Sequence, residues 1–317
     1  MLSYVLSRSL QALVVLALVV VVAFATVQLM PGDALMAALA GTGNVADASG
    51  LEAVRKAYGL NGTLPEQFWR WLVNFVQGNW GISMNTGQDV IDMFRQRAPV
   101  TIELFIGGLL WALVLGVPVG IICAFRRGSK LDTFLSGASL TGIALPPTFE
   151  ALALIYLLSV VFQLLPVAGY TEFSEDPWEN LQSMLMPSFV VGSHLAGVLA
   201  RYVRAGVIEV LRQDFIRTAR AKGLTEVQIL LRHAIKPALV PVVTVLGFSF
   251  AGMLAGSFIV EFIFALPGIG RMAVDAAFAK DYAVIQAVLV VTAVNVLVVN
   301  LLVDLCYAAL DPRIRLR

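Results

Sequence analysis

The stretch RTARAKGLTEVQILLRHAIKPA, from Arg217 to Ala238, is cationic and lies between two long apolar runs. Its only acid is Glu226, and its basic residues are Arg217, Arg220, Lys222, Arg232 and Lys236. A cationic segment in such a setting has two main interpretations. It binds a polyanion, or it lies on one face of a membrane and meets another protein there.

The composition of the whole chain indicates which setting applies. Hydrophobic residues make up 59% of the 317 residues, charged residues make up 14%, and the mean hydropathy is +0.84. Soluble globular proteins carry roughly 25% charged residues, so this composition predicts an integral membrane protein. Cys123 and Cys306 both lie in apolar runs without metal-ligand spacing, and we expect two free, buried thiols.

Six apolar runs are long enough to cross a hydrocarbon core, which takes about 20 helical residues. They are continuous and do not alternate with polar residues, so they predict an all-α protein with six transmembrane helices. The first run is too long for a cleaved signal peptide. The runs are Leu10–Leu29, Val100–Phe125, Phe134–Leu165, Leu185–Val203, Leu239–Phe264 and Val284–Leu310.

The spans divide the chain into three parts. Residues 1–30 form an N-terminal transmembrane helix, residues 31–99 an external loop, and residues 100–317 a five-helix core with a cytoplasmic loop at 209–236. The external loop is rich in aromatic residues that suit a helix at the membrane interface. These residues are Phe68, Trp69, Trp71, Phe75 and Trp80.

The short loops predict the orientation in the membrane. RRGSK, from Arg126 to Lys130, is basic, whereas the loop between the third and fourth runs carries only acids, such as Glu172 and Asp176. Because basic loops stay on the cytoplasmic side, RRGSK is expected inside and the acidic loop outside. Both termini and the cationic segment are then cytoplasmic.

The cationic segment itself predicts two amphipathic helices joined by a bend. Gly223 has the position of a C-terminal cap, and Thr225 with Gln228 forms a capping box that starts the second helix. Pro237 is expected to end that helix before the fifth run. The small side chains of Ala219 and Ala221 near the bend would let another surface come close.

These residues resemble the coupling loop, or EAA loop, of ABC-importer permeases. RTARAKGL and HAIKPALVP are similar to its form in the dipeptide/oligopeptide (nickel) permease family, in particular the first, or B-type, permease. Arg217 and Thr218 stand where Glu and Ala are usual in the wider family, and Gly223 to Pro237 is one residue longer, as in the peptide branch. Further similar stretches are LMPGDAL from Leu29, YGLNGTLPEQFWRWL from Tyr58, GNWGIS from Gly78, LPPTF from Leu145, EFIFALPGIGR from Glu261 and KDY from Lys280.

The resemblance implies a type I ABC importer permease with a cytoplasmic coupling helix, in a bacterial inner membrane. Such a permease works with a second homologous permease, two cytoplasmic ATPase subunits and an external substrate-binding protein. ATP and Mg²⁺ would be bound by the ATPases, since no GxxxxGK[ST] occurs in this chain. The chain itself would be no enzyme and hold no cofactor or metal. The coupling contacts would come from Phe215, Arg217, Thr218, Ala219, Lys222, Gly223, Leu224 and Thr225.

Other interpretations of the cationic segment compete with this one. A basic helix-turn-helix could bind nucleic acid, but the apolar spans on both sides leave no room, and no nucleic-acid partner is expected. A basic hairpin could also rest on anionic lipid of the bilayer. A different class of function is an ion-coupled secondary transporter or intramembrane enzyme that uses Glu150, Glu261 and Asp304 as a carboxylate relay.

Ionisable residues within the spans are candidates for the translocation path. Glu150 follows two prolines and either lines the path, caps a half-helix or faces a wet cavity. His194 either lines the path or makes a hydrogen bond in a packed interior. Glu261 belongs to an outer gate or stabilises the fold, while Glu103 and Asp304 lie near span ends, where their side chains reach the interface.

The substrate is less well defined by the residues. The permeases of this family resemble one another while serving dipeptides, longer peptides, glutathione, nickel chelates or sugars, because the external binding protein does much of the selecting. Peptides are the leading class by the frequency of substrates in the family.

Overall fold

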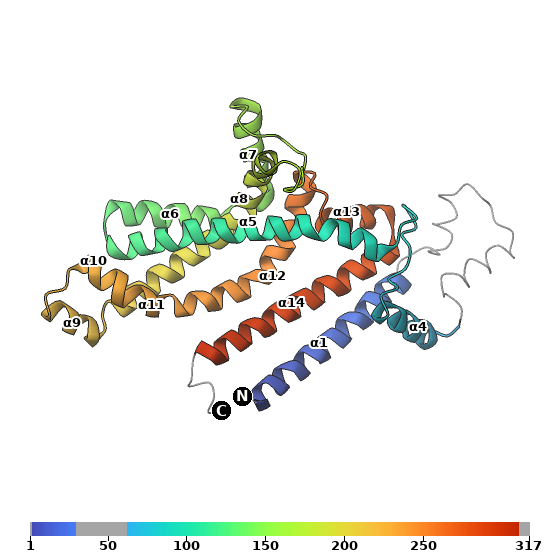
Figure 1. Ribbon diagram of the computed structural model, residues 1–317, viewed down its shortest axis with the longest axis horizontal. Coiled ribbons are helices and arrows are strands. Elements are labelled where there is room, and N and C mark those ends of the chain that lie inside the picture. The colour runs from blue at the N-terminus through green and yellow to red at the C-terminus, as the bar shows by residue number, and fades with distance from the viewer. Residues whose placement is uncertain (1, 30–61, 311–317) are drawn as a thin grey trace.

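The computed structural model describes residues 2–29 and 62–310 of the chain, with some side chains in α1, α12 and α14 outside the description. Within these residues the secondary structure is helices joined by loops, apart from an isolated bridge between Ile82 and Asp89. The long helices run side by side, and α7 projects from the bundle (Figure 1). They are α1 (Leu2–Leu29), α5 (Val90–Phe125), α6 (Lys130–Ala144), α8 (Pro177–Val210), α12 (Val240–Ile263) and α14 (Tyr282–Leu310).

Shorter helices connect the long ones or lie at their ends. Two of them are π-helical, namely η1 and η2. The set comprises α4 (Leu64–Val76), α7 (Pro147–Leu154), η1 (Ile155–Val161), α9 (Asp214–Ala221), α10 (Glu226–Ile229), η2 (Leu230–Ala234), α11 (Ile235–Ala238) and α13 (Ile269–Ala279). Helices α13 and α4 lie at the end of the bundle opposite α9 and α10 (Figure 1).

Helices occupy all six predicted runs, but the number of spans stays a prediction. In the described part, α5, α8 and residues 282–301 of α14 are each long and apolar enough to cross a membrane. The third run is not one straight helix, because it bends by 107° between α6 and α7, where Pro146 and Pro147 follow each other. Proline lacks the N–H that would continue the α6 hydrogen-bond ladder. The pair is either a broken span or a re-entrant segment.

Most of the long helices start earlier than their apolar runs, and α5 and α8 are examples. Helix α5 begins at Val90 and α8 at Pro177, because a helix continues past the hydrocarbon boundary where local signals support it. The start of α8 has such a signal, since the Asp176 carboxylate accepts hydrogen bonds from the backbone N–H groups of Trp178 and Glu179. Pro177 then occupies the first helical position, which suits its fixed φ angle. The residues DPWE, from Asp176 to Glu179, therefore explain why α8 begins at Pro177.

The core of the bundle is the contact between α5 and α8, which is made close by small residues. A Cβ atom at Gly116 would lie 2.7 Å from the carbonyl oxygen of Ala196, and one at Gly192 would overlap the carbonyl of Gly108. Backbones approach this closely only where side chains are absent, as is common between membrane helices. The two helices therefore form a rigid pair, on which α6 packs through Gly197.

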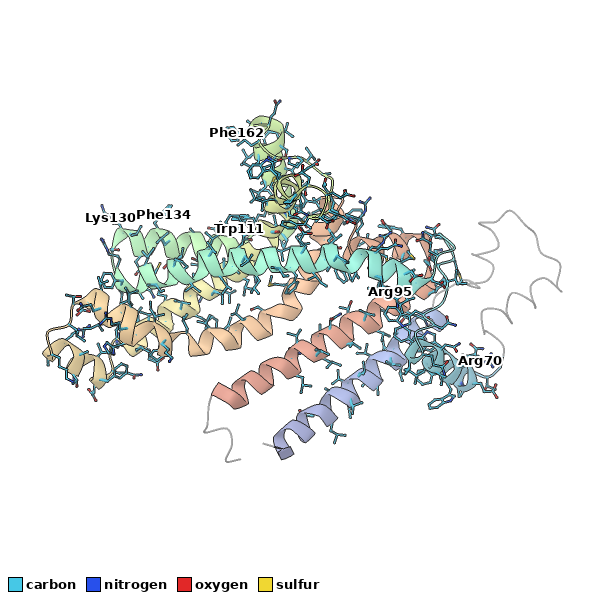
Figure 2. The ribbon with its side chains drawn as sticks, in the orientation of Figure 1. Arg70, Arg95, Trp111, Lys130, Phe134 and Phe162 are labelled. Carbon is cyan, nitrogen blue, oxygen red and sulfur yellow. The ribbon has the colours of Figure 1, made fainter. Side chains whose placement is uncertain are left out.

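The two basic segments lie at the same end of the bundle, as predicted. The loop from α5 to α6 and the α9–α11 region are neighbours in Figure 1, and Figure 2 shows Lys130 at that end, with Arg70 and Arg95 at the other. The aromatic loop before α5 contains helix α4, whose Phe68 and Trp71 pack against Phe24 of α1. Its position at a membrane interface stays a prediction. Which end faces the cytoplasm stays a prediction.

Candidate functional site

The bend between α9 and α10 has a defined geometry centred on Gly223. This residue has φ +82°, in the left-handed region that favours glycine. Its N–H donates to the carbonyl of Arg220 (2.9 Å), and the N–H of Leu224 donates to that of Ala219 (3.4 Å). This pair of bonds is a Schellman motif, which satisfies carbonyls at a helix end. The predicted C-terminal cap is confirmed.

An ion pair spans the bend. Arg220 donates from Nε to Oε1 of Glu226 (2.6 Å) and from Nη2 to Oε2 (3.1 Å). The guanidinium on α9 and the carboxylate on α10 therefore form a bidentate ion pair, or fork, with two parallel hydrogen bonds. The hydrogen bond from Arg220 holds the pKa of Glu226 below its ordinary value. The side chains are 44% and 51% exposed, so water screens the attraction. The fork sets the direction of α9 relative to α10.

The second half of the hairpin starts as predicted and ends within one residue of the predicted position. Thr225 Oγ1 accepts from the N–H of Gln228 (3.4 Å), and Gln228 Oε1 accepts from that of Thr225 (3.1 Å), which confirms the capping box. Pro237 was expected to end the helix before the fifth run. Helix α11 ends at Ala238, one residue after Pro237, and α12 begins at Val240. The π-helical segment η2 precedes α11, with the N–H of Ile235 bonded to the carbonyl of Leu230.

The predicted coupling residues divide into an outer and an inner set. Phe215 and Thr218 on α9 and Lys222 at its C-cap are exposed and follow one another at helical spacing. Arg217, Gly223 and Thr225 are also exposed. Ala219 is instead buried in the chain's own core beside Ile216, and Leu224 packs against the same cluster. The outer set presents an apolar ring and a cation to whatever lies beyond the hairpin. The inner set holds the hairpin on the bundle.

A cavity of about 390 Å³ lies where the bent segment meets α8 and α12. Its lining is mostly apolar, and His194 is its one ionisable side chain among the described lining residues. A cavity of this size at a meeting of helices is a common form of ligand site. The lining comprises Ile143, Ala144, Leu145, Pro146, Pro147, Val190, Val191, His194, Leu195, Ser249, Gly252, Met253, Gly256 and Val260.

Glu150 lies close to this cavity without lining it. It occupies the first turn of α7, is half-buried, and accepts a hydrogen bond from the hydroxyl of Ser193 on α8 (2.7 Å). Ser193 is the chain neighbour of His194, so α8 places both near the bend. The N-cap of α7 is Pro146, which makes no side-chain cap hydrogen bond.

Glu261 has a different environment and is fully buried, at 0% exposure. Its carboxylate accepts from Thr101 Oγ1 (2.8 Å) and from the backbone N–H of Arg271 (3.1 Å), in the first turn of α13. An anion in this position satisfies the free N–H groups of a helix start. A Cβ atom at Gly268 would overlap the carboxylate, which explains the glycine in ALPGIGR. The structure thus gives Glu261 a role in holding α13 to α12 and α5, away from the cavity lining.

Two further stretches singled out in the sequence, GNWGIS and KDY, contact each other. Ser83 in GNWGIS donates its hydroxyl to Asp281 in KDY, and both side chains are buried. A second hydrogen bond joins Tyr170 to Glu103 of α5 (2.9 Å). These contacts join the loop before α5 to the residue before α14, and the loop before α8 to α5. The side chain of Asp304 lies outside the described residues.

The arrangement of a cavity between membrane helices, with a capped basic hairpin at one end, can be compared with known proteins. Residues 116–316 match the family model described as the binding-protein-dependent transport system inner membrane component. Residues 1–105 match the model of the N-terminal region of such membrane components. The chain belongs to the binding-protein-dependent transport permease family.

Individual proteins agree with this family assignment. The glutathione transport system permease protein GsiC of Escherichia coli (strain K12) is 38% identical over 315 residues, which cover 99% of each chain. The same protein of Pectobacterium atrosepticum is 37% identical with the same coverage. Among solved structures, the inward-facing MetNI methionine ABC transporter matches with a TM-score of 0.56 and 18% identity, covering 69% of this chain and 96% of that chain.

This family member is therefore a membrane permease subunit of an ABC importer with the type I fold. Its place is in an assembly with ATPase and permease partners, and such permeases are not enzymes in themselves. The resemblance stated from the coupling loop is confirmed along the whole chain. An ion-coupled secondary transporter, the other function considered, is not favoured.

Sequence reasoning overlooked one polar contact near the hairpin. Asp132 at the start of α6 is buried and forms an ion pair with Arg204 of α8. A local signal existed, since Ser129 and Asp132 have the spacing of a helix start and Ser129 Oγ accepts from the N–H of Asp132 (3.2 Å). The partner on α8, however, is 72 residues away.

Proposed function

We propose that this permease imports small peptides, with glutathione as one candidate, in a bacterial inner membrane with both termini cytoplasmic. The observation that carries the substrate class is the 38% identity over 99% of the chain to a permease named for glutathione transport. Glutathione is a tripeptide, so the peptide class includes it. An external substrate-binding protein would deliver the cargo to the permease pair.

The proposed assembly contains a second homologous permease and two ATPase subunits that bind ATP and Mg²⁺. The outer set of hairpin residues, with Phe215 as its apolar member and Lys222 as its cation, would dock into an ATPase. The inner set, with Ala219 and Leu224, belongs to the core cluster and would transmit the movement to α10 and, by way of α11, to α8 and α12. Closure of the ATPases on ATP would then change access to the cavity.

The cavity is proposed as this subunit's share of the translocation path. His194 would face the cargo, with Glu150 on the adjacent half-helix held by Ser193. Glu261 would contribute indirectly, because it holds α13 at the end of α12. The mostly apolar lining suits a cargo that passes without being held tightly.

Reconstitution tests the substrate and the energy source together. The permease, purified with its partner subunits and their binding protein, is placed in liposomes, and uptake of labelled glutathione and of a labelled dipeptide is measured. ATP on the side of the ATPases is expected to drive uptake of at least one of the two, and ionophores that collapse proton and sodium gradients should leave uptake unchanged. Uptake of neither compound would refute the peptide class, and uptake driven by an ion gradient without ATP would refute the importer function.

A further inference from the structure

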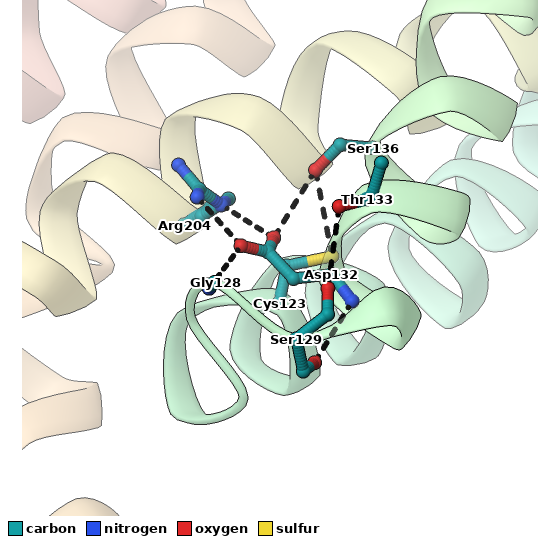
Figure 3. A network of polar contacts seen from close by, with 7 residues as sticks. All are labelled: Cys123, Gly128, Ser129, Asp132, Thr133, Ser136 and Arg204. Atoms are coloured by element: carbon teal, nitrogen blue, oxygen red, sulfur yellow. Dashed lines mark hydrogen bonds and ion pairs between the residues drawn. The ribbon is translucent and has the colours of Figure 1, made fainter.

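The ion pair between Asp132 and Arg204 has a geometry that ties two helices firmly together (Figure 3). Arg204 donates from Nε to one carboxylate oxygen and from Nη2 to the other, both at 2.9 Å. The same carboxylate accepts from the backbone N–H of Gly128 (2.9 Å) and from Ser136 Oγ (3.2 Å). The side chain of Asp132 is 7% exposed and that of Arg204 is 33% exposed. A buried carboxylate with four donated hydrogen bonds is fully satisfied.

The place of the pair in the chain connects the hairpin to the cavity. Arg204 lies near the end of α8, and that helix leads through residues 211–213 into α9. Asp132 lies in the first turn of α6, and the opposite end of α6 lines the cavity with Ile143 and Ala144. In the described part of the chain, this is the one side-chain ion pair or hydrogen bond between α6 and α8.

The pair resists movements that packing alone permits. Farther along, α6 and α8 meet through Gly197, where a Cβ atom would lie 2.5 Å from the carbonyl of Ser139. Such a contact transmits a push, but it gives little resistance when the helices separate or rotate. A guanidinium fork fixes both distance and orientation, because two parallel hydrogen bonds must be kept. With the fork in place, α6 follows α8 in both directions.

Helix α12, the opposite wall of the cavity, packs on α8 but, among the residues that the structure describes, makes no extensive contact with α6. Its Gly252 and Gly256 line the cavity, and a Cβ atom at either would meet no atom within 4 Å. A movement of α6 together with α8 relative to α12 would therefore change the width of the cavity. If α8 moved without α6, the α6 wall of the cavity would keep its distance from α12.

We propose that the Asp132–Arg204 ion pair is the joint that carries movement of the hairpin from α8 to the α6 wall of the cavity. Both are positioning residues that touch neither cargo nor nucleotide. The proposal rests on the proposed coupling function of the hairpin and extends it to a specific contact. A purely static role would make the pair necessary for folding and irrelevant to nucleotide-dependent movement.

The test measures distances in the whole complex in liposomes, without nucleotide and with ATP plus orthovanadate. In a background without native cysteines, one spin label is placed at Ile259 of α12 and the other at Leu140 of α6 or at Tyr202 of α8. All three side chains are exposed in this chain. In the parent protein, nucleotide is expected to change both the α6–α12 and the α8–α12 distances.

The variants remove the joint without leaving a lone buried charge. Asp132→Asn combined with Arg204→Gln neutralises both partners, because a single substitution would strand the other charge and threaten folding. Arg204→Lys keeps the charge and loses the fork. Arg201→Gln, an exposed position on the same helix, is the matched control. Amounts of assembled complex are compared first by size-exclusion chromatography.

The expected result is a loss of the nucleotide-dependent α6–α12 change in the double variant, with the α8–α12 change retained. Arg204→Lys should give a partial loss, and Arg201→Gln should behave as the parent. The proposal is overturned if α6 still moves with α8 in the double variant, if both movements disappear together, or if the double variant does not assemble. If α8 does not move even in the parent, the coupling function of the hairpin fails and the joint fails with it.

Discussion

Replacement of Gly223 by residues that tolerate its backbone angle to different degrees gives a graded test of the hairpin. At φ +82°, a Cβ atom would meet nothing within 4 Å, so the cost of a side chain comes from the backbone and not from a clash. A left-handed conformation costs an L-residue about 1–2 kcal/mol. This cost corresponds to a factor of about 5–30 between the native bend and bends with negative φ.

The three substitutions should rank by the same physical cause. Gly223→Asn should have the smallest effect, because Asn is the residue besides glycine that most readily adopts this region. Gly223→Ala should be intermediate, and Gly223→Val should have the largest effect, since β-branching adds to the strain. We expect the activity to fall in this order, while binding of cargo to the isolated receptor is unchanged.

The assay is receptor-stimulated ATP hydrolysis by the reconstituted complex, after the amounts of inserted permease have been matched. Gly87→Val is the control, because Gly87 has φ +71° and equally free space but lies in the loop between α4 and α5. Equal activities for the Asn and Val variants would refute the conformational explanation. An equal loss in Gly87→Val would show a general assembly defect, and parental activity in Gly223→Val would rule out the hairpin as the coupling element.

Three other predictions concern orientation, the ion pair across the bend and the carboxylate near the cavity. With native cysteines removed, a cysteine replacing Arg127 should be shielded from a membrane-impermeant thiol reagent in intact cells and one replacing Ser174 should react; the reverse pattern would invert the topology. Arg220 lowers the pKa of Glu226, so the ion pair stabilises the hairpin at any pH above the ordinary carboxyl pKa. This stabilisation is lost as the pH falls through the lowered pKa of Glu226. Glu226→Gln should therefore speed hydrogen exchange in the hairpin at neutral pH and match the parent at the acid limit, and a difference that persists in acid would contradict this. Glu150→Gln should change uptake at normal assembly, since Ser193 can still donate to the amide oxygen, whereas uptake equal to that of the parent would leave Glu150 only the role of holding α7 on α8.

The hairpin was predictable from sequence because its signals are local. A glycine at a helix end, a Thr–Gln capping box and the amphipathic period all act within a few residues, and the Gly223 angle and both capping bonds of Thr225 have the predicted form. Pro237 acts over an equally short range, and α11 ends one residue after it. The π-helical segment η2 before α11 was not predicted, because no local pattern in the sequence indicates it.

The burial of the hairpin was less predictable. The pattern indicated two faces on α9, but Ala219, expected near a docking surface, lies in the chain's own core with Ile216. An amphipathic pattern with apolar residues such as Phe215 on more than one side does not say which face meets the bundle. The contacts of α9 with α10 and with the core cluster make that choice.

The sequence by itself determined that this chain is a membrane protein, where its helices lie and how the hairpin is capped, because hydropathy and capping depend on neighbouring residues. Only the tertiary structure decided that Glu261 caps α13, that Asp132 pairs with Arg204 and that α6 and α7 meet at 107°. Thr101 and Glu261 are 160 residues apart, and Asp132 and Arg204 are 72 apart. Runs that are apolar on every side carry no mark of which face packs on which helix. That choice depends on close approach at small residues and on satisfying each buried charge, and both are properties of the assembled bundle.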